Sequence, residues 1–273
     1  MGGTLYVVAT PIGNLEDITY RAVRTLREVS RIACEDTRHT RRLLDHYGID
    51  RPAVSYHEHN ERERTEDLLN WLRGGEDIAL VSDAGTPLIS DPGYRVVEAA
   101  VREGIKVVPL PGPAAFVTAL MASGLPTDAF YYGGFLPARS GQRRRTLETL
   151  AEIGCVLAFY EAPHRLLEAL ADMDVVFGKR TVVVSRELTK LHEEFARGTA
   201  AELLTVFTGR GVKGEITILI DKAGEVEREI ASIRTVFERH VNGGLSRMDA
   251  MKATARDCGV SKREVYAELE RAE

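Results

Sequence analysis

Short apolar runs alternate with amphipathic segments along the first half of the chain. The runs are typical of buried parallel strands, and they lie at 5–9, 32–34, 53–56, 78–81 and 105–110. Between them, apolar residues recur at helical spacing. Thr19 is placed to cap the first helix, and Gly48 to end the second. A further helix is expected over 113–122, closed by Gly124.

The second half restarts the pattern after the boundary expected at 125–128. Strands are predicted at 130–132, 156–160, 181–184 and 215–220, with an antiparallel edge strand at 193–197. Thr199 and Glu202 have the spacing of a capping box. In the first half, strands that alternate with helices favour a mainly parallel α/β sheet. We therefore expect an N-terminal α/β domain over 1–124 and a C-terminal α/β domain over 125–224.

Residues 225–273 change in character and form the third predicted part. The segment 225–229 is a charged linker or a helix start, and Ser246 and Ser261 can each cap a helix. The spacing of small, Gly, cap and apolar residues over 255–265 resembles a helix-turn-helix. Five basic and two acidic residues lie between 242 and 263. We favour nucleic-acid contact for this tail over a helical hairpin that only packs on the body.

Composition limits the classes of function. The 273 residues are 44% hydrophobic and 28% charged, which is ordinary for a globular protein. The net charge of -5 excludes a global basic field, so nucleic-acid contact must come from local patches. Three widely spaced cysteines fit a reducing compartment without disulfides or a metal centre. With neither a signal peptide nor a membrane span in view, we expect a cytoplasmic protein that binds no metal.

Two loops of small residues are the strongest candidate for a binding site. One, 82–93, follows the apolar run 78–81, and the other, 111–115, follows the run 107–110. Open α/β sheets bind ligands at the carboxyl ends of their strands, and small residues let a ligand lie against the backbone. On neighbouring strands these loops would form one slot for a flat, partly apolar ligand. The alternative is that both are only tight turns.

A glycine motif elsewhere is discarded. Residues 209–214 match the GxGxxG pattern. However, a dinucleotide fingerprint follows a strand and opens a helix, whereas these glycines follow a helix and precede a strand. We interpret the segment as a turn.

Eight short motifs follow one another along the chain, at 10–19, 35–38, 82–93, 111–113, 134–137, 161–165, 186–190 and 213–215. Together they resemble the ribosomal RNA small subunit methyltransferase I family, within the tetrapyrrole methylase superfamily, over residues 4 to about 222. The tail resembles that family's helix-turn-helix appendage. At 82–85 the chain has Ser-Asp-Ala-Gly where tetrapyrrole-modifying relatives have Gly-Asp-Pro, which weakens a corrinoid or sirohaem assignment.

The resemblance implies two α/β domains with the active-site cleft between them and a small helical appendage. It implies S-adenosylmethionine (SAM) as methyl donor and 2′-O-ribose methylation of a cytidine in the decoding region of 16S rRNA in the 30S subunit, usually by a homodimer. The residues expected to bind SAM are Pro11, Asp83, Ala84, Gly85, Ser90, Ala114, Ala115, Phe135, Tyr160, Glu161, Gly214 and Glu215. For Phe135 and Tyr160, plain core packing is an equal alternative.

Methyl transfer from a sulfonium is an in-line displacement, in which proximity alone can contribute about 7–11 kcal/mol. A ribose hydroxyl is a poor nucleophile unless its proton is removed or its oxyanion is stabilised. The catalytic candidates are Glu161, Glu187 and Lys190, with Glu215 beside them. The sequence does not choose a base among them, and Glu187 and Lys190 are also spaced for a simple ion pair.

RNA contact is expected at basic residues around the cleft. The candidates are Arg38 with Arg41 and Arg42, then Arg143, Arg144 and Arg145, and finally Arg165 and Arg186. Each group is otherwise a solvated face. Two rival functions stay open: a SAM-dependent methylase of a tetrapyrrole or a protein side chain, and a nucleotide-sensing regulator that binds DNA through its tail.

Overall fold

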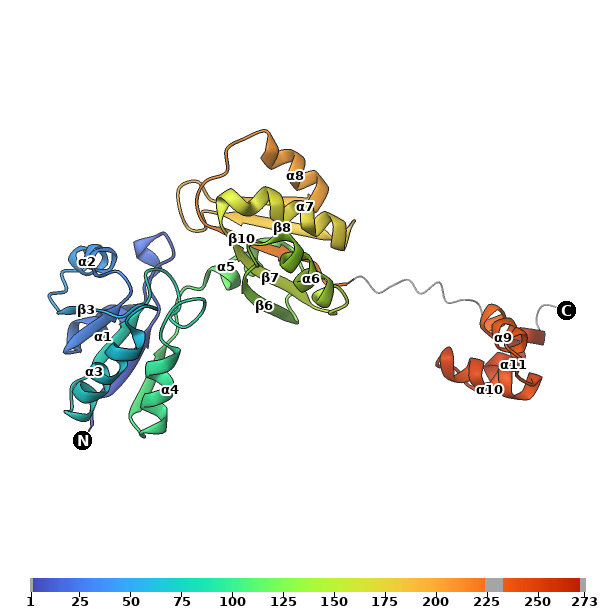
Figure 1. Ribbon diagram of the computed structural model, residues 1–273, viewed down its shortest axis with the longest axis horizontal. Coiled ribbons are helices and arrows are strands. Elements are labelled where there is room, and N and C mark those ends of the chain that lie inside the picture. Colours follow the sequence, from blue (N-terminus) through green and yellow to red (C-terminus); the bar gives the residue numbers. More distant parts are fainter. Residues whose placement is uncertain (1, 224–232, 271–273) are drawn as a thin grey trace. The chain divides into compact units, whose positions relative to one another are not determined.

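The computed structural model describes residues 2–223 and 233–270 of the chain. It divides into two compact units, Met1–Lys222 and Ala223–Glu273. The predicted charged linker or helix start at 225–229 lies outside the described residues. Figure 1 shows the elements in chain order.

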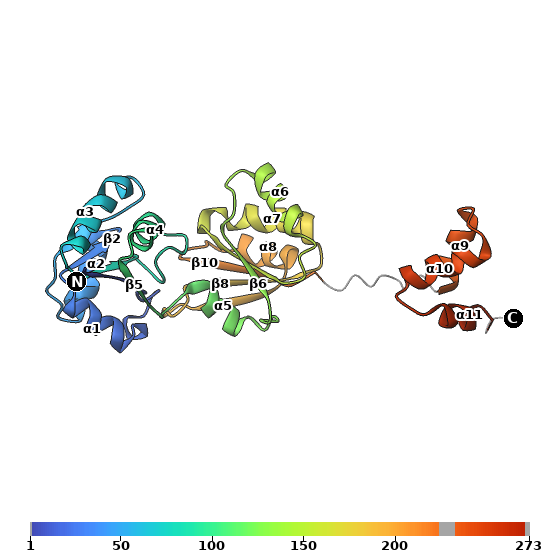
Figure 2. The same ribbon diagram turned by 90° about the horizontal axis from the view of Figure 1, so that it is seen from below.

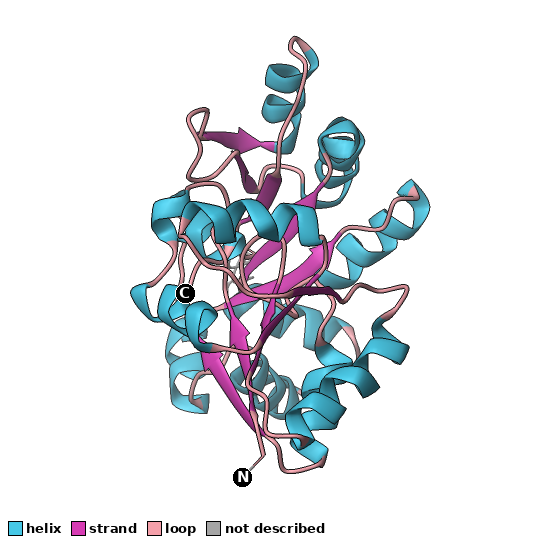
Figure 3. Cartoon of the chain, turned by 90° about the vertical axis from the view of Figure 1, so that its left-hand side faces the viewer, coloured by secondary structure: helices cyan, strands magenta, loops and turns pink. Residues whose placement is uncertain are grey.

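The first sheet is fully parallel. Its strand order is β3 (Ala53–Ser55), β2 (Arg31–Cys34), β4 (Ile78–Val81), β1 (Thr4–Val8) and β5 (Lys106–Leu110). Helices cover both faces of this sheet (Figure 3). One face packs on α1 (Tyr20–Glu28) and α2 (Thr37–His46), and the other on α3 (Glu61–Arg73) and α4 (Tyr94–Arg102). Burial on both faces explains why β4 is a continuous apolar run, whereas the edge strands β3 and β5 are only partly buried.

Local capping follows the sequence pattern. The Thr19 hydroxyl accepts the backbone N–H of Ala22 at the start of α1. Gly48, with φ of 61°, follows α2, and Gly124, with φ of 81°, closes α5 (Ala115–Ser123). In each case the left-handed backbone favours glycine. These predicted helix ends are confirmed.

The second sheet is mixed. Its order is β6 (Phe130–Phe135), β7 (Val156–Glu161), β10 (Ile216–Ile220), β8 (Thr181–Arg186) and β9 (Glu194–Thr199). Only the β6–β7 pairing is parallel, because β10 enters between β7 and β8 and runs against both. The mainly parallel arrangement that was expected from the first half is thus confined to the first sheet. The antiparallel edge strand and the capping box at Thr199 are confirmed.

Helices also cover both faces of the second sheet. The 3-10 turn Pro163–Arg165 leads into α7 (Leu166–Phe177), which packs with α6 (Ser140–Leu150) and α8 (Ala200–Thr208) on one face. The opposite face packs on α5, through Ala119 and Leu120 (Figure 2). The predicted boundary at residue 124 assigned α5 to the first half, but its packing ties it to the second sheet. The chain thus crosses between the sheets in the loop 111–114.

The second unit is a three-helix cluster of α9 (Ile233–Asn242), α10 (Arg247–Asp257) and α11 (Lys262–Glu270). Its buried side chains include Ala250, Ala253 and Val265. The Ser246 hydroxyl caps α10, and Ser261 and Glu264 form the predicted reciprocal cap of α11. These contacts fit the expected helix-turn-helix spacing. Within the described ranges, no helix has the length and apolarity needed to cross a membrane.

Candidate functional site

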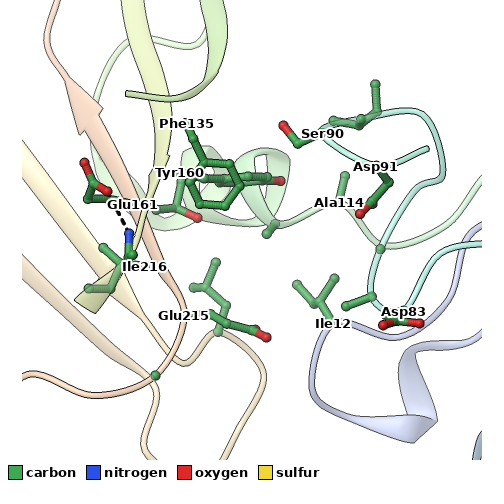
Figure 4. A pocket seen from close by; sticks show the side chains of 18 of the residues that line it. Ile12, Asp83, Ser90, Asp91, Ala114, Phe135, Tyr160, Glu161, Glu215 and Ile216 are labelled. Carbon is green, nitrogen blue, oxygen red and sulfur yellow. Dashed lines mark hydrogen bonds between the residues drawn. The ribbon is translucent and has the colours of Figure 1, made fainter. Parts of the chain in front are cut away.

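A cavity of about 340 Å³ lies at the carboxyl ends of the first sheet's central strands, facing the second sheet. It is lined by Ile12, Asp83, Ala84, Gly85, Thr86, Ile89, Ser90, Asp91, Ala114, Ala115, Phe135, Tyr160, Glu161, Ala162, Pro163, Leu188, Gly214, Glu215, Ile216 and Thr217. We call this the first cavity. Its size falls in the range of small-molecule sites, about 300–1,000 Å³. Figure 4 shows the residues of the two walls facing each other.

The cavity wall that the first sheet contributes, which we call the lower wall, is built from three strand ends and not two. The loops after β4 and β5 are not neighbours, since β1 lies between those strands. The loop after β1 joins the β4 loop through a bridge in which Thr10 and Gly85 exchange backbone hydrogen bonds of 2.8 and 3.0 Å. The loop after β1 therefore also lines the predicted slot, through Ile12. The two loops of small residues named from the sequence form only part of it.

Backbone strain is concentrated in the loops that line the cavity. Gly85 has φ of 83°, and a side chain there would place its Cβ 3.2 Å from the Ile12 Cγ2. Leu88 and Ser90 hold positive φ without being glycine, and so do Glu187 and Thr189 on the opposite wall. Such conformations cluster at functional sites because the surrounding structure must hold them in place.

Aromatic side chains from β6 and β7 form the wall that the second sheet contributes, which we call the upper wall. The rings of Phe135 and Tyr160 lie edge to face with centroids 5.7 Å apart. Phe135 is 56% exposed, so it is not a core residue, which disfavours the alternative of plain packing for this side chain. The Tyr160 hydroxyl accepts the backbone N–H of Phe116 at 3.3 Å. The rings are thus available as a face for a flat group.

The cavity has an acidic lining. Asp83, Asp91, Glu161 and Glu215 contribute carboxyl groups, and among the described residues no Lys, Arg or His side chain lines it. Burial, together with the charges of Glu35 and Asp83, raises the pKa of Asp91 to about 7. The arrangement favours a ligand that carries positive charge. Sequence analysis missed Asp91, although it lies inside the motif at 82–93, because Asp-Pro-Gly is also an ordinary turn sequence.

Glu161 is poorly placed to act on a ligand. Its side chain is fully buried, and one carboxylate oxygen accepts the backbone N–H of Ala162 at 2.8 Å. The carboxylate points away from the middle of the cavity (Figure 4) and forms an ion pair with Arg165 at 3.1 Å. Burial raises the pKa of Glu161 despite these two partners. The contacts indicate that Glu161 holds the start of the Pro163 turn.

Glu187 and Lys190 form the ion pair that their spacing allowed. The Lys190 Nζ lies 2.9 Å from Glu187 and 3.0 Å from Glu215. The hydrogen bond from Lys190 lowers the pKa of Glu187, and the two carboxylates raise the pKa of Lys190 although burial opposes this. Lys190 therefore stays protonated at neutral pH. Neither residue of this pair has the pKa of a general base working near pH 7.

The residues predicted to bind a cofactor come together with one exception. All of them except Pro11 line the first cavity, although no observation tests their role as ligands. Pro11 instead lines a second cavity of about 370 Å³, because the turn after β1 directs Ile12 toward the first. The second cavity is lined by Thr10, Pro11, Ile12, Gly13, Leu15, His39, Thr40, Arg42, Leu43, Ser82, Asp83, Ala84, Lys190 and Glu215.

The arginine cluster on α6 behaves differently from its prediction. Arg143 is completely buried and its Nε lies 2.7 Å from the Asp172 carboxylate, so the prediction that Arg143 contacts RNA is wrong. Arg144 pairs with the other oxygen of Asp172 at 2.6 Å, with its side chain 45% exposed. Arg145 is exposed and has no side-chain partner among the described residues. Of these three arginines, only Arg145 is fully available to an outside anion.

The other predicted RNA contacts have internal partners to different degrees. Arg165 pairs with Glu161 and donates to the Leu136 carbonyl, and Arg186 pairs with Glu194, so both support the upper wall. The Arg38 side chain is 88% exposed although it pairs with Asp36. RNA contact by Arg38 and Arg145 stays a prediction. No group of metal-ligating side chains suited to an ion occurs in residues 2–223 or 233–270.

Comparison with known proteins places these features among relatives. A family model described as tetrapyrrole (corrin/porphyrin) methylases matches residues 4–204. Ribosomal RNA small subunit methyltransferase I of Halalkalibacterium halodurans is 49% identical over 97% of this chain and 93% of its own length. The Pseudomonas aeruginosa protein of the same name is 56% identical over 74% and 72%. The crystal structure of a diphthine synthase superposes with a TM-score of 0.65 at 14% identity, covering 80% of this chain and 90% of its own, a likeness of fold.

Proposed function

Because this chain belongs to the ribosomal RNA small subunit methyltransferase I family of tetrapyrrole methylases, we propose that it is an rRNA methyltransferase that uses SAM. The observation that carries the proposal is the acidic, aromatic-walled first cavity at the strand ends. We further propose that the methyl group goes to the 2′-hydroxyl of a cytidine in the decoding region of 16S rRNA.

The residues of the first cavity fit SAM. The cofactor carries positive charge on its sulfonium and its ammonium group, and the cavity offers Asp83 and Asp91 with no basic side chain among the described residues. An anionic dinucleotide or nucleoside triphosphate would meet the same carboxylates unfavourably, which argues against a nucleotide-sensing regulator. Phe135 and Tyr160 offer ring faces to an adenine, and Gly85 lets the backbone come close.

The protein's own contribution to the reaction is placement and charge. When bound, the cofactor supplies an electrophilic methyl group. The two walls enclose the site on both sides, so that a donor and an acceptor can be held in line. Protonated Lys190, held by Glu187 and Glu215, is a cation suited to stabilise charge that develops on an attacking oxygen. In this account Glu187 positions Lys190 and Glu161 supports the wall, in place of the catalytic roles first considered for both.

A structured RNA fits the distribution of charge. The chain is acidic overall, so binding depends on local basic side chains such as Arg38 and Arg145. A target read by its shape, such as the assembled 30S subunit, needs fewer phosphate contacts than a bare strand. The helical tail would add Lys262 and Arg263 at the start of α11, both exposed.

We also propose a homodimer, as membership of the family implies. Besides Phe135, which lines the first cavity, four large apolar side chains are exposed on α5 and β6: Val117, Met121, Phe130 and Tyr131. Met121 is 81% exposed, which is unfavourable in a monomer. Met121→Glu should shift the protein to monomers in sedimentation, whereas a dimer that survives this change uses another surface.

The test is transfer of tritium from methyl-labelled SAM by the purified protein. Label should enter the RNA of 30S subunits lacking this modification, and 50S subunits should stay unlabelled. Label in ribosomal protein, or in a uroporphyrinogen or precorrin offered in parallel, would favour the rival methylases. Absence of SAM binding by calorimetry would refute the proposal altogether.

A further inference from the structure

The two cavities share one wall. Ile12, Asp83, Ala84 and Glu215 line both, so anything bound in the second cavity lies beside the ligand of the first. In an in-line methyl transfer, the acceptor approaches the methyl carbon from the side opposite the sulfur, so it needs a place next to the donor site. The second cavity is therefore the place where the acceptor group can be held.

The second cavity differs from the first in having basic side chains. Arg42 and Lys190 line it, together with His39 and the shared carboxylates Asp83 and Glu215, whereas the described lining of the first cavity contains no basic side chain. Arg42 is exposed on α2 and makes no ion pair or hydrogen bond among the described residues. Its neighbour Arg41 is paired with Asp45 at 2.8 Å. Arg42 is thus a guanidinium free to bind a phosphate.

A buried polar atom in this cavity lacks a partner. Thr40 is 3% exposed and lines the cavity, yet its Oγ1 has no hydrogen-bond partner of acceptable geometry within the described chain, its neighbour being the weakly bonding Cys34 thiol. Buried hydroxyls are normally satisfied, so this one points to a ligand that completes it. Pro11 and Leu15 add an apolar strip on the same cavity, suited to the face of a base.

We propose that the second cavity holds one unstacked nucleotide of the RNA substrate. Arg42 binds its phosphate, Thr40 hydrogen-bonds its base edge, and its ribose lies at the shared wall beside Lys190 and Glu215. This inference rests on the proposed methyl-transfer function and adds the site of the acceptor. Enzymes usually reach an atom within a folded nucleic acid by removing a single nucleotide from its stack.

The proposed methyl transfer takes place at the shared wall. The 2′-oxygen forms a bond to the methyl carbon as the carbon–sulfur bond breaks, and that electron pair stays on sulfur. The hydroxyl proton passes to the Glu215 carboxylate. Asp83 is the other carboxylate common to both cavities, but of the two only Glu215 lies beside Lys190, which pairs with its Oε2 at 3.0 Å. Glu215 thus acts on the substrate through its other oxygen, while Lys190 stabilises charge on the ribose oxygen.

The experiment measures binding of cytidine 5′-monophosphate and of cytidine to the full-length protein saturated with S-adenosylhomocysteine, followed by NMR titration. Arg42→Ala should weaken the monophosphate about tenfold, equivalent to about 1.4 kcal/mol, and leave cytidine unchanged. Arg24→Ala is the matched control, because Arg24 is an exposed helical arginine that lines neither cavity and has no side-chain partner among the described residues. Thr40→Val, which keeps the buried volume, should weaken both probes about threefold to tenfold.

Two outcomes overturn the inference. In one, neither probe binds; in the other, Arg42→Ala and Arg24→Ala have the same effect. If SAM still binds and label still enters 30S subunits, the proposed function stands and only the acceptor site is refuted. Glu215→Gln adds a kinetic readout: the rate at saturating 30S should fall while the affinity for cytidine 5′-monophosphate stays unchanged.

Discussion

SAM affinity should fall as the pH is lowered through 7, because of Asp91. The pKa of this carboxyl is raised to about 7, first by burial and then by the charges of Glu35 and Asp83. A cationic ligand binds best to the ionised form. Below pH 7 the ligand must therefore displace a proton, so the gain in affinity is present above pH 7 and is lost below it.

The magnitude follows from the fraction of ionised molecules. With a pKa of about 7, that fraction is roughly one in eleven at pH 6 and roughly ten in eleven at pH 8. The apparent dissociation constant should thus rise about tenfold between pH 8 and pH 6, which is about 1.4 kcal/mol. Close to one proton should be released for each SAM bound at pH 6.

Calorimetry at pH 6, 7 and 8, in buffers of different ionisation enthalpy, gives both the affinity and the proton count. Asp91→Asn should bind SAM with little dependence on pH, and Asp128→Asn, at an exposed position outside the cavity, should behave as wild type. Because the folded pKa is raised, ionisation of Asp91 destabilises the folded state as pH rises from about 4 to 7. Asp91→Asn should therefore raise Tm more at pH 8 than at pH 4. Equal wild-type affinities at pH 6 and pH 8 would refute the reasoning.

Three further predictions follow from the geometry. Gly85→Val should abolish SAM binding, because a branched side chain would enter the cavity; Gly104→Val imposes similar backbone strain with nothing within 4 Å of its Cβ and should still bind in calorimetry. Arg143→Ala removes the fully buried one of the two arginines that pair with Asp172 and should lower the free energy of unfolding by about 3–5 kcal/mol in urea titrations. Arg145→Ala should change it by less than about 0.5 kcal/mol. Excess EDTA should leave SAM affinity unchanged; a weaker affinity would contradict a metal-free site.

The strands of both sheets could be predicted from the sequence because most of them are short apolar runs separated by helices. The pairing directions within the second sheet could not, apart from the edge strand, since strand direction leaves no trace in the spacing of apolar residues. Ile216–Ile220 is as apolar as a parallel strand, and only the fold shows that it runs antiparallel between β7 and β8. The packing of α5 on the second sheet is likewise decided by tertiary contacts and could not be predicted from the sequence pattern.

Site residues that lie in loops with a recognisable motif could be predicted from the sequence. Residues whose burial or charge depends on partners far away in the sequence could not. Gly85 and Ser90 line the first cavity as expected from the loop that contains them. The burial of Arg143 depends on Asp172, which is 29 residues away, so three consecutive arginines gave no sign of it. Asp91 was missed for a similar reason, because its raised pKa comes first from burial and then from the charges of Glu35, at the end of another strand, and of Asp83.

The central claim is that the methyl group reaches a ribose hydroxyl of small-subunit RNA, and one measurement tests it directly. RNA from 30S subunits labelled by the protein with tritiated SAM is digested to nucleosides and separated by chromatography. The account predicts that the label elutes as 2′-O-methylcytidine, and that the labelled linkage resists alkaline hydrolysis. Label in a base-methylated nucleoside, or in an alkali-sensitive linkage, would contradict it.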